Sequence, residues 1–354
     1  MERVVYLLGA GFSAPLGLPV MNNFLSKSKD MYFEDRERYK HFNDVFKQIR
    51  DFSVIKHYYD SDQFNIEEIL SILEMASQLE GKRLKKNFIK YLSDVINFYT
   101  PTIQPYLDTL PSNWHDIMFG SDNQHKNYGY FYAGLLNLCI RKPIRHRVFG
   151  LEPSNNVKAF YAVITLNYDR VLENYSDHIS SFLNIRTDRL TFRSEFSDSM
   201  QSFSERPFFA KLHGSVELDN IVPPTWSKGV DQRILSAWRI AYLALIEATQ
   251  IRIIGYSLPE ADAYVKYLLK SAVMKAPHLK HLDVLCLDPS GEAHKKYDEF
   301  VKFPFYRFVN RDVTDYLASH RNIYRSRRDG DNQVLEVISL EDFHHDFFKT
   351  HANE

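Results

Sequence analysis

The sequence predicts a doubly wound α/β protein with a mostly parallel sheet and a large helical insertion after the first strand. Two observations support this prediction: short runs of apolar and β-branched residues recur along the chain, and helical patterns separate several of them. Near-continuous hydrophobicity, rather than alternation, is typical of strands buried on both faces of a parallel sheet. Strands that alternate with helices favour an open, Rossmann-like sheet. The predicted strands span residues 4–8, 161–165, 208–212, 251–254, 283–287 and 305–309.

The long segment between the first two strands has a mainly helical pattern. Asn65 fits a helix N-cap, and Ile66, Ile69, Leu70 and Leu73 follow at helical spacing. Near the end of the chain, an Asp-Gly pair at 329–330 lies between residues 322–328 and 333–338 and suggests a hairpin. The predicted domains are a discontinuous sheet core at 1–24 and 156–312, a helical insertion at 25–155 and a C-terminal appendage at 313–354.

Composition narrows the class of protein. The chain has 354 residues, of which 44% are hydrophobic and 25% charged, as expected for a soluble globular protein. The formal net charge of −1 gives no overall field to attract nucleic acid or an acidic membrane. One basic stretch, 321–328, is either a solvated hairpin face or a local nucleic-acid contact, so direct nucleic-acid binding stays open.

The two cysteines, Cys139 and Cys286, lie far apart in the sequence. They exclude a disulfide framework and a zinc site built from four thiolates, and they fit a reducing cytosol. No run reaches the roughly 20 apolar residues that a membrane-spanning helix needs. A protein of the cytoplasm, with no membrane association, is therefore expected.

A glycine loop follows the first predicted strand. Residues 9–14, Gly-Ala-Gly-Phe-Ser-Ala, fit the G-x-G-x-x-G/A pattern of loops that bind a pyrophosphate. The alternative is an ordinary glycine-rich turn. A redox enzyme also needs a second buried strand that ends in an acid about 20 residues on. Residues 27–36 are polar instead, so hydride transfer is disfavoured.

Polar residues also follow the later strands. Asn167 and Asp169 come directly after the second strand, where they could bind ribose or water or simply cap a helix. His213 follows the third strand, and such a histidine can accept a proton near neutral pH. Gly255 and Ser257 follow the fourth strand and Asp288 the fifth. Each feature alone could be turn chemistry, but the ends of parallel strands meet at one edge of the sheet, so the set predicts one crevice.

In this order, the motifs resemble those of the sirtuin-like superfamily, which consumes NAD. Residues 9–13 resemble its GAG-x-S loop, and 17–19 its Gly-Ile-Pro. Residues 167–169, Asn-Tyr-Asp, resemble its Asn-Ile-Asp, and His213-Gly214 resembles its catalytic His-Gly. Residues 255–257 fall on its Gly-Thr/Ser-Ser turn. The resemblance covers about half of the chain.

The departures point away from protein deacylation. The chain cannot supply the four-cysteine zinc module of deacylating sirtuins, and Asp288 stands where an asparagine usually contacts the adenosine ribose. The segments ITLNYDRVLE, KLHGSV and IIGYSLPEADAYVKYLLK look more like zinc-free, sirtuin-like effectors of bacterial anti-phage defence. That resemblance implies a homo-oligomer and a separate partner such as a HerA-type hexameric ATPase.

The resemblance implies an NAD glycohydrolase that releases nicotinamide and ADP-ribose, with NAD as substrate and no metal. A non-catalytic sensor of NAD or ADP-ribose is the alternative, and a deacylase or ADP-ribosyltransferase comes third. Oligomer size, the trigger, the formation of cyclic ADP-ribose and any nuclease activity stay open. The expected catalytic residues are His213 and Asn167, and the expected NAD-binding residues are Gly9, Ala10, Gly11, Phe12, Ser13, Asp169, Gly255, Ser257 and Asp288.

Overall fold

The six predicted strands form one parallel sheet. The computed structural model of the chain describes residues 1–59, 65–80, 84–103, 119–120, 122–143, 150–154, 157–182, 192–194, 203–204, 206–217, 221–222, 234–276, 278–322, 325–329, 332–336 and 340–352. Within these residues the main sheet has the order β5-β4-β1-β6-β7-β8, and each neighbouring pair is parallel. The strands are β1 (Glu2–Leu8), β4 (Ala159–Thr165), β5 (Phe208–Lys211), β6 (Gln250–Ile254), β7 (His281–Leu285) and β8 (Tyr306–Val309). The predicted doubly wound, Rossmann-like α/β class is confirmed.

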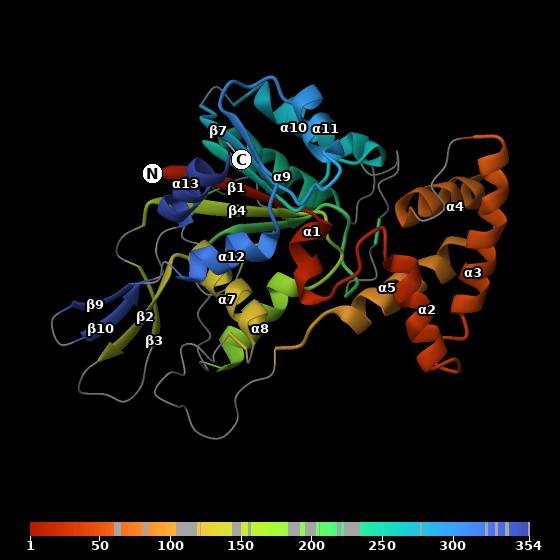
Figure 1. Cartoon of the computed structure of the whole chain (residues 1–354), viewed down its shortest axis with the longest axis horizontal. Helices are drawn as coiled ribbons and strands as arrows, with labels where there is room; N and C mark the ends of the chain where they lie inside the picture. Colours follow the sequence, from red (N-terminus) through yellow and green to blue (C-terminus); the bar gives the residue numbers. More distant parts are fainter. Residues whose placement is uncertain are drawn as a thin grey trace.

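Helices cover both faces of this sheet (Figure 1). Alternate strand residues such as Val5 and Leu7 pack on one face, and Val4 and Tyr6 pack on the other, so every strand is buried on both sides. The first face is covered by α9 (Leu235–Glu247), α10 (Ala263–Val273) and α11 (Glu292–Phe300). The second face is covered by α7 (Asn123–Leu135), α8 (Val171–Phe182), α12 (Val313–Asn322) and α13 (Leu340–His351).

A group of helices projects from one side of the sheet, and we call residues 24–99 the helical lobe (Figure 1). Its core is aromatic: the rings of Phe42 and Tyr91 lie 4.8 Å apart, and the Tyr91 hydroxyl donates a 2.7 Å hydrogen bond to Ser28. Asn65 accepts a hydrogen bond from the Glu68 N–H, as its predicted capping role requires. The lobe contains α2 (Phe24–Glu34), α3 (Phe42–Asp51), the 3₁₀ helix η2 (Phe52–His57), α4 (Ile66–Glu80) and α5 (Leu84–Tyr99).

The end of the insertion differs from the mainly helical segment that the sequence predicts up to residue 155. Helix α7 packs on the main sheet, where its Phe131 ring lies 5.3 Å from Tyr6. Two strands then follow and pair with the predicted C-terminal hairpin in an antiparallel sheet of order β3-β2-β10-β9. Its strands are β2 (Leu138–Pro143), β3 (Gly150–Pro153), β9 (Arg325–Asp329) and β10 (Asn332–Glu336). The predicted domain boundaries themselves stay predictions.

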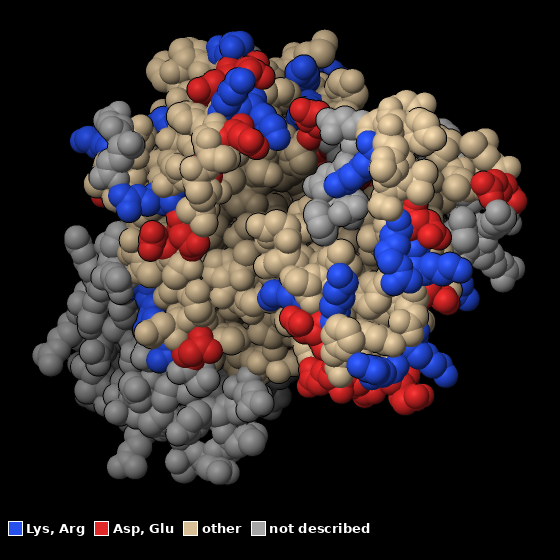
Figure 2. Space-filling view, turned by 45° about the vertical axis from the view of Figure 1, so that its right-hand side comes forward, with Lys and Arg blue, Asp and Glu red and all other residues tan. Residues whose placement is uncertain are grey.

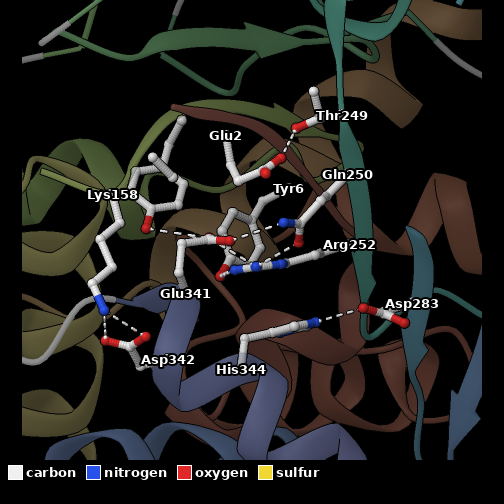
Figure 3. A network of polar contacts seen from close by, with 12 residues as sticks. Glu2, Tyr6, Lys158, Thr249, Gln250, Arg252, Asp283, Glu341, Asp342 and His344 are labelled. Carbon is white, nitrogen blue, oxygen red and sulfur yellow. Dashed lines mark hydrogen bonds and ion pairs between the residues drawn. The ribbon is translucent and has the colours of Figure 1, made fainter. Parts of the chain in front are cut away.

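The C-terminal segment is joined to the sheet core by a buried polar network (Figure 3). Arg252 on β6 contacts Glu341 on α13 at 2.8 Å and donates a 2.8 Å hydrogen bond to the Tyr6 hydroxyl. His344 on α13 lies 2.9 Å from Asp283 on β7. These contacts, together with those of Arg307 and Tyr316, form what we call the α13 network. Because it ties α13 to three central strands, this helix is part of the core rather than a loose tail.

Candidate active site at the carboxyl edge of the sheet

The strand ends are in register, so the residues after them share one edge. Leu8 pairs with Thr165 on one side and with Ile254 on the other, and Ile254 pairs with Leu285. After β1 the chain forms β4 and β5 on one side of β1, and later β6, β7 and β8 on its other side. The boundary between β1 and β6 is therefore the topological switch point of the sheet. Ligands of doubly wound folds bind at such a point, beyond the carboxyl ends of the strands.

The glycine loop after β1 crosses the turn after β6 at this point. The Gly11 N–H donates a 2.8 Å hydrogen bond to the Gly255 carbonyl, and the Gly9 N–H donates to Ile254 at 3.0 Å. A Cβ on Gly9 would lie 2.6 Å from the Gly255 oxygen, and one on Gly255, whose φ is +66°, would lie 2.3 Å from the Phe12 nitrogen. Three glycines are therefore required for the crossing itself.

Because of this crossing, several N–H groups of the loop are already hydrogen-bonded to the protein and not directed at a phosphate site. The N–H groups of Gly9, Gly11 and Phe12 all donate to carbonyls of the protein. Phe12 and Ser13 are each only 2% exposed, and the Phe12 ring packs 5.1 Å from that of Tyr128 in the core. Ala10, at the start of the short helix α1 (Ala10–Ser13), is the exposed residue of the loop. Any ligand would approach the loop from that side.

Asn167 lies beside this loop, as the sequence predicts. Its side-chain amide donates to the Gly9 carbonyl at 2.9 Å and to the Ser13 hydroxyl at 3.0 Å, and the side chain is buried. Its backbone N–H donates to the Thr165 hydroxyl at 3.1 Å, which fixes the turn after β4. Asn167 thus joins the ends of β4 and β1 through the glycine loop.

The Asp169 side chain caps the start of α8. One carboxylate oxygen accepts a 3.0 Å hydrogen bond from the Val171 N–H, which matches the capping alternative that the sequence leaves open. The Lys211 ammonium donates to the Asp169 carbonyl and to the Glu173 carboxylate, the latter at 2.7 Å. Burial raises the pKa of Glu173, while the ion pair with Lys211 opposes this rise.

A small cavity lies between these groups. It has a free volume of about 10 Å3, at the lower limit for one water molecule. Polar atoms of Ser13, Asn167 and Asp169 line it beside the ring of Phe12. His213 is not among its lining residues. On a larger scale, the molecular surface is hollowed in the middle of the face that carries the helical lobe, with charges of both signs on its upper rim (Figure 2).

His213 follows β5 and is only 1% exposed. Its Nε2 lies 3.5 Å from a carboxylate oxygen of Asp262, and its ring lies 5.7 Å from that of Tyr168, next to Asn167. The other Asp262 oxygen accepts a 3.1 Å hydrogen bond from the Tyr256 hydroxyl, next to Gly255. Joined by the chain links Gly255–Tyr256 and Tyr168–Asn167, these contacts form a ring around the switch point, from the glycine loop through Asp262 and His213 back to the loop.

Sequence reasoning missed Asp262 as a site residue. It lies six residues after Tyr256, in the same turn that supplies Gly255 and Ser257, and resembles ordinary helix-start chemistry. The signal that could have found it is an acid in the turn that follows a strand, because the turns after β5 and β6 reach the same edge of the sheet. Only the three-dimensional contact with His213 distinguishes it from the exposed Glu260 two residues before it.

The remaining predicted residues have different surroundings. Ser257 is exposed at the turn after β6. Asp288 is buried and accepts hydrogen bonds from the His294 N–H at 2.8 Å and the Ser290 hydroxyl at 3.2 Å. Burial alone would raise its pKa, but these hydrogen bonds outweigh burial and lower it. The Asp288 carboxylate therefore already stabilises the start of α11.

Neither a metal cluster nor a membrane helix is found among the described residues. In that part of the chain, no group of three or more His, Cys, Asp or Glu side chains could hold a metal ion. No helix in the same part is long and apolar enough to cross a membrane.

Comparison with known proteins gives one family match. Residues 161–302 match the model of the SIR2-like domain. No curated protein matches the chain. Among solved structures, Sir2 bound to an acetylated peptide is 13% identical, covers 90% of this chain and 91% of its own, and has a TM-score of 0.36. Sir2 with a p53 peptide and NAD+ is 14% identical at the same coverage, with a TM-score of 0.31. Values this low support no argument about activity.

Proposed function

We propose that this chain hydrolyses NAD to nicotinamide and ADP-ribose. One observation supports the proposal above all: the glycine loop, Asn167 and His213 belong to one ring of contacts at the switch point of the sheet. Four of the six strand ends at that edge, those of β4, β5, β6 and β7, lie inside the SIR2-like match at 161–302, and the domain implies NAD-related chemistry. Asn167 and His213 lie inside the family match, and the glycine loop lies outside it but contacts Asn167 and Gly255.

Hydrolysis of the nicotinamide–ribose bond of NAD needs no general acid from the protein. The bond to break joins C1′ of ribose to a cationic nicotinamide, whose nitrogen takes the bonding electrons and leaves neutral. A water oxygen then forms the new bond to C1′, and its proton must be accepted. The site has to stabilise an oxocarbenium-like centre and orient that water, as in glycoside hydrolysis. In the proposal, Asn167 orients the ribose or the water and His213 accepts the proton.

The small cavity is too small for the nucleotide, and because His213 does not line it, the attacking water of the proposal lies outside it. Asn167 and Asp169 line it, and its volume suits a single water molecule. The nucleotide is far larger, so in the proposal its pyrophosphate lies against the exposed Ala10 side of the glycine loop. Gly255, Ser257 and Asp288 stand along the same edge, at the ends of β6 and β7. Their contacts with NAD are part of the proposal.

We further propose that this NAD hydrolysis serves bacterial anti-phage defence. In this proposal the enzyme is a homo-oligomer of the bacterial cytoplasm, restrained until a partner such as a HerA-type ATPase signals infection. The support is the sequence resemblance of the longer motifs, together with a helical lobe that the strand–helix core does not need. Comparable rates of NAD loss with and without the partner would count against this defence role.

A non-catalytic sensor is the second candidate. The observation that favours it is the burial of His213, which is 1% exposed and therefore has the surroundings of a structural histidine. A sensor would keep the glycine loop and bind NAD without releasing nicotinamide. Deacylation is less well supported because two cysteines cannot form a four-thiolate zinc site.

The first experiment measures nicotinamide release from NAD by the full chain, alone and with candidate partners. His213→Ala should reduce turnover by about 10²–10⁴-fold, the usual contribution of a general base. Asn167→Ala should also lose turnover because the glycine loop loses two hydrogen bonds. The matched control is His278→Ala, which removes a histidine whose Nε2 contacts the Ile246 carbonyl, outside the ring of contacts.

The outcomes separate the candidates. Loss of activity in the two site variants, with His278→Ala at the wild-type rate, supports hydrolysis. NAD binding without nicotinamide release by the wild type supports the sensor. Full activity in a well-folded His213→Ala protein removes this histidine from the mechanism.

A further inference from the structure

Asp262 lies at a helix N-terminus but does not cap the helix with its side chain. It is the N-cap residue of α10, where an aspartate usually accepts hydrogen bonds from the first N–H groups of the helix. All of α10 is described, and the Asp262 carboxylate makes no capping bond to it. The side chain is 3% exposed. A buried carboxylate that gives up its capping role needs another reason for its position.

That reason is the pair of groups it faces. Its Oδ1 lies 3.5 Å from His213 Nε2, and its Oδ2 accepts a 3.1 Å hydrogen bond from the Tyr256 hydroxyl. The Tyr256 carbonyl in turn accepts a 2.9 Å hydrogen bond from the hydroxyl of Tyr297, which is fully buried. The carboxylate is therefore fixed from one side and directed at the imidazole on the other.

The turn that carries Asp262 is rigid. Gly255 has φ +66° and Leu258 has φ +55°, and the latter is rarely tolerated by a side chain larger than glycine. Leu258 is nevertheless 1% exposed, so packing holds it in this strained conformation. Strain of this kind persists where the position of a nearby group matters.

We propose that Asp262 is the positioning residue of His213, resting on the proposed hydrolysis of NAD. The carboxylate favours the tautomer with hydrogen on Nε2, and this leaves the lone pair on Nδ1 as the proton acceptor. During hydrolysis, Nδ1 takes the proton of the attacking water while the water oxygen bonds to C1′. The resulting imidazolium is stabilised by the negative charge of Asp262, and the proton is then released to solvent.

The kinetic test compares two acids of the same turn. Asp262→Asn keeps the size of the side chain but loses its charge, so kcat should fall by about 10²–10⁴-fold, the range of the general base it positions. KM should stay within about threefold, because in the proposal Asp262 does not touch NAD. Glu260→Gln changes an exposed acid two residues away and should leave both constants unchanged.

The pH profile separates positioning from simple packing. Loss of the negative charge makes the imidazolium less stable, so the acid limb of kcat against pH should move to lower pH in Asp262→Asn. A purely structural role would lower the free energy of unfolding without moving this limb. Tyr256→Phe keeps the charge but frees the carboxylate from its hydroxyl partner, and it should reduce kcat less than Asp262→Asn does.

A second measurement needs no activity. Nitrogen-15 NMR of labelled histidine, with the His213 signals assigned by a His213→Gln variant, should show hydrogen on Nε2 in the wild type and a mixed population in Asp262→Asn. If the wild type releases no nicotinamide but shows this tautomer, the proposed function fails and the pairing stands. An Nδ1–H tautomer in the wild type, or unchanged kcat and pH limb in a folded Asp262→Asn, overturns the positioning role.

Discussion

Two buried polar clusters among the described residues differ in the lengths of their charged contacts. In the α13 network, Asp283 accepts two 2.7 Å hydrogen bonds from Arg307 and lies 2.9 Å from His344. At the carboxyl edge of the sheet, the contact between Asp262 and His213 is 3.5 Å long. Short, mutually satisfying contacts stabilise a fold, so the α13 network is assigned to stability. The longer contact between Asp262 and His213 is the one on which the proposed proton transfer rests.

The protonation states in the α13 network support this contrast. Burial disfavours the imidazolium and lowers the pKa of His344 to about 3, with the charge of Arg252 adding to the effect. Burial alone would raise the pKa of Asp283, but hydrogen bonds from His344 and Arg307 hold it well below its usual range. His344 is therefore neutral: its Nε2 donates to Asp283 and its Nδ1 accepts from the Tyr316 hydroxyl at 2.9 Å. Every polar atom of this imidazole has a partner.

The largest stability effect should come from Asp283→Asn. This change leaves the partly exposed Arg307 guanidinium without its buried counter-charge, and breaking a buried ion pair costs up to about 3–5 kcal/mol. Urea unfolding measures the loss, and turnover per folded molecule should stay close to the wild-type value. His213→Gln, which keeps most of the volume of the buried imidazole, should give the reverse result, with a smaller loss of stability and a larger loss of turnover. Equal stability losses in both variants would break the comparison between the two clusters.

An intermediate effect is the acid sensitivity of the fold. The unfolded chain protonates His344 near pH 6.5, but the folded chain does so only near pH 3, so the unfolded state binds more protons between these values. Stability should therefore fall as the pH drops through this window, by up to about 1.4 kcal/mol per pH unit. Below about pH 4, Asp283 adds to the loss because its pKa is also depressed in the folded state.

The variant that isolates this contribution is His344→Gln. It should flatten the dependence of the unfolding free energy on pH between about 6.5 and 4.5, measured by thermal or urea unfolding at fixed ionic strength. His57→Gln, at an exposed position of the helical lobe, is the matched control and should keep the wild-type slope. A His344→Gln protein with the wild-type slope would show that other groups govern acid unfolding.

The smallest effect should come from the outer edge of the same region. Lys158 contacts Asp342 on α13 at 2.5 Å, but both side chains are about half exposed. Exposed ion pairs contribute about 0–1 kcal/mol, so Lys158→Ala should lower the unfolding free energy by no more than that, and less at high salt. A loss as large as that of Asp283→Asn would mean that α13 is held from its surface rather than from its buried face.

Much of the main sheet could be predicted from the sequence because a strand buried on both faces is recognisable as a short, nearly continuous hydrophobic run. Each run such as 4–8 or 161–165 is largely apolar, and the structure contains a strand at every predicted place. The glycine loop, Asn167 and His213 could be named because each follows such a run directly. Register between parallel strands then brings them to one edge.

Other parts depended on contacts between distant segments. Strands β2 and β3 complete a sheet with the hairpin near the C-terminus, and no local pattern indicates that pairing. The buried position of α13 depends on Arg252 and Asp283, polar residues inside apolar strands whose partners lie about 60–90 residues away. The role of each glycine in the loop was also hidden, because the clash that excludes a side chain comes from Gly255 on another strand.

The sequence by itself determined the strand–helix alternation, the parallel sheet and the residues that end each strand, because hydrophobic periodicity and turn chemistry act over a few neighbouring residues. Only the tertiary structure decided that Asp262 faces His213 and that α13 belongs to the core. The direction of a buried charge is set by the partner that compensates its lost hydration. That partner comes from a part of the chain which local patterns do not reach.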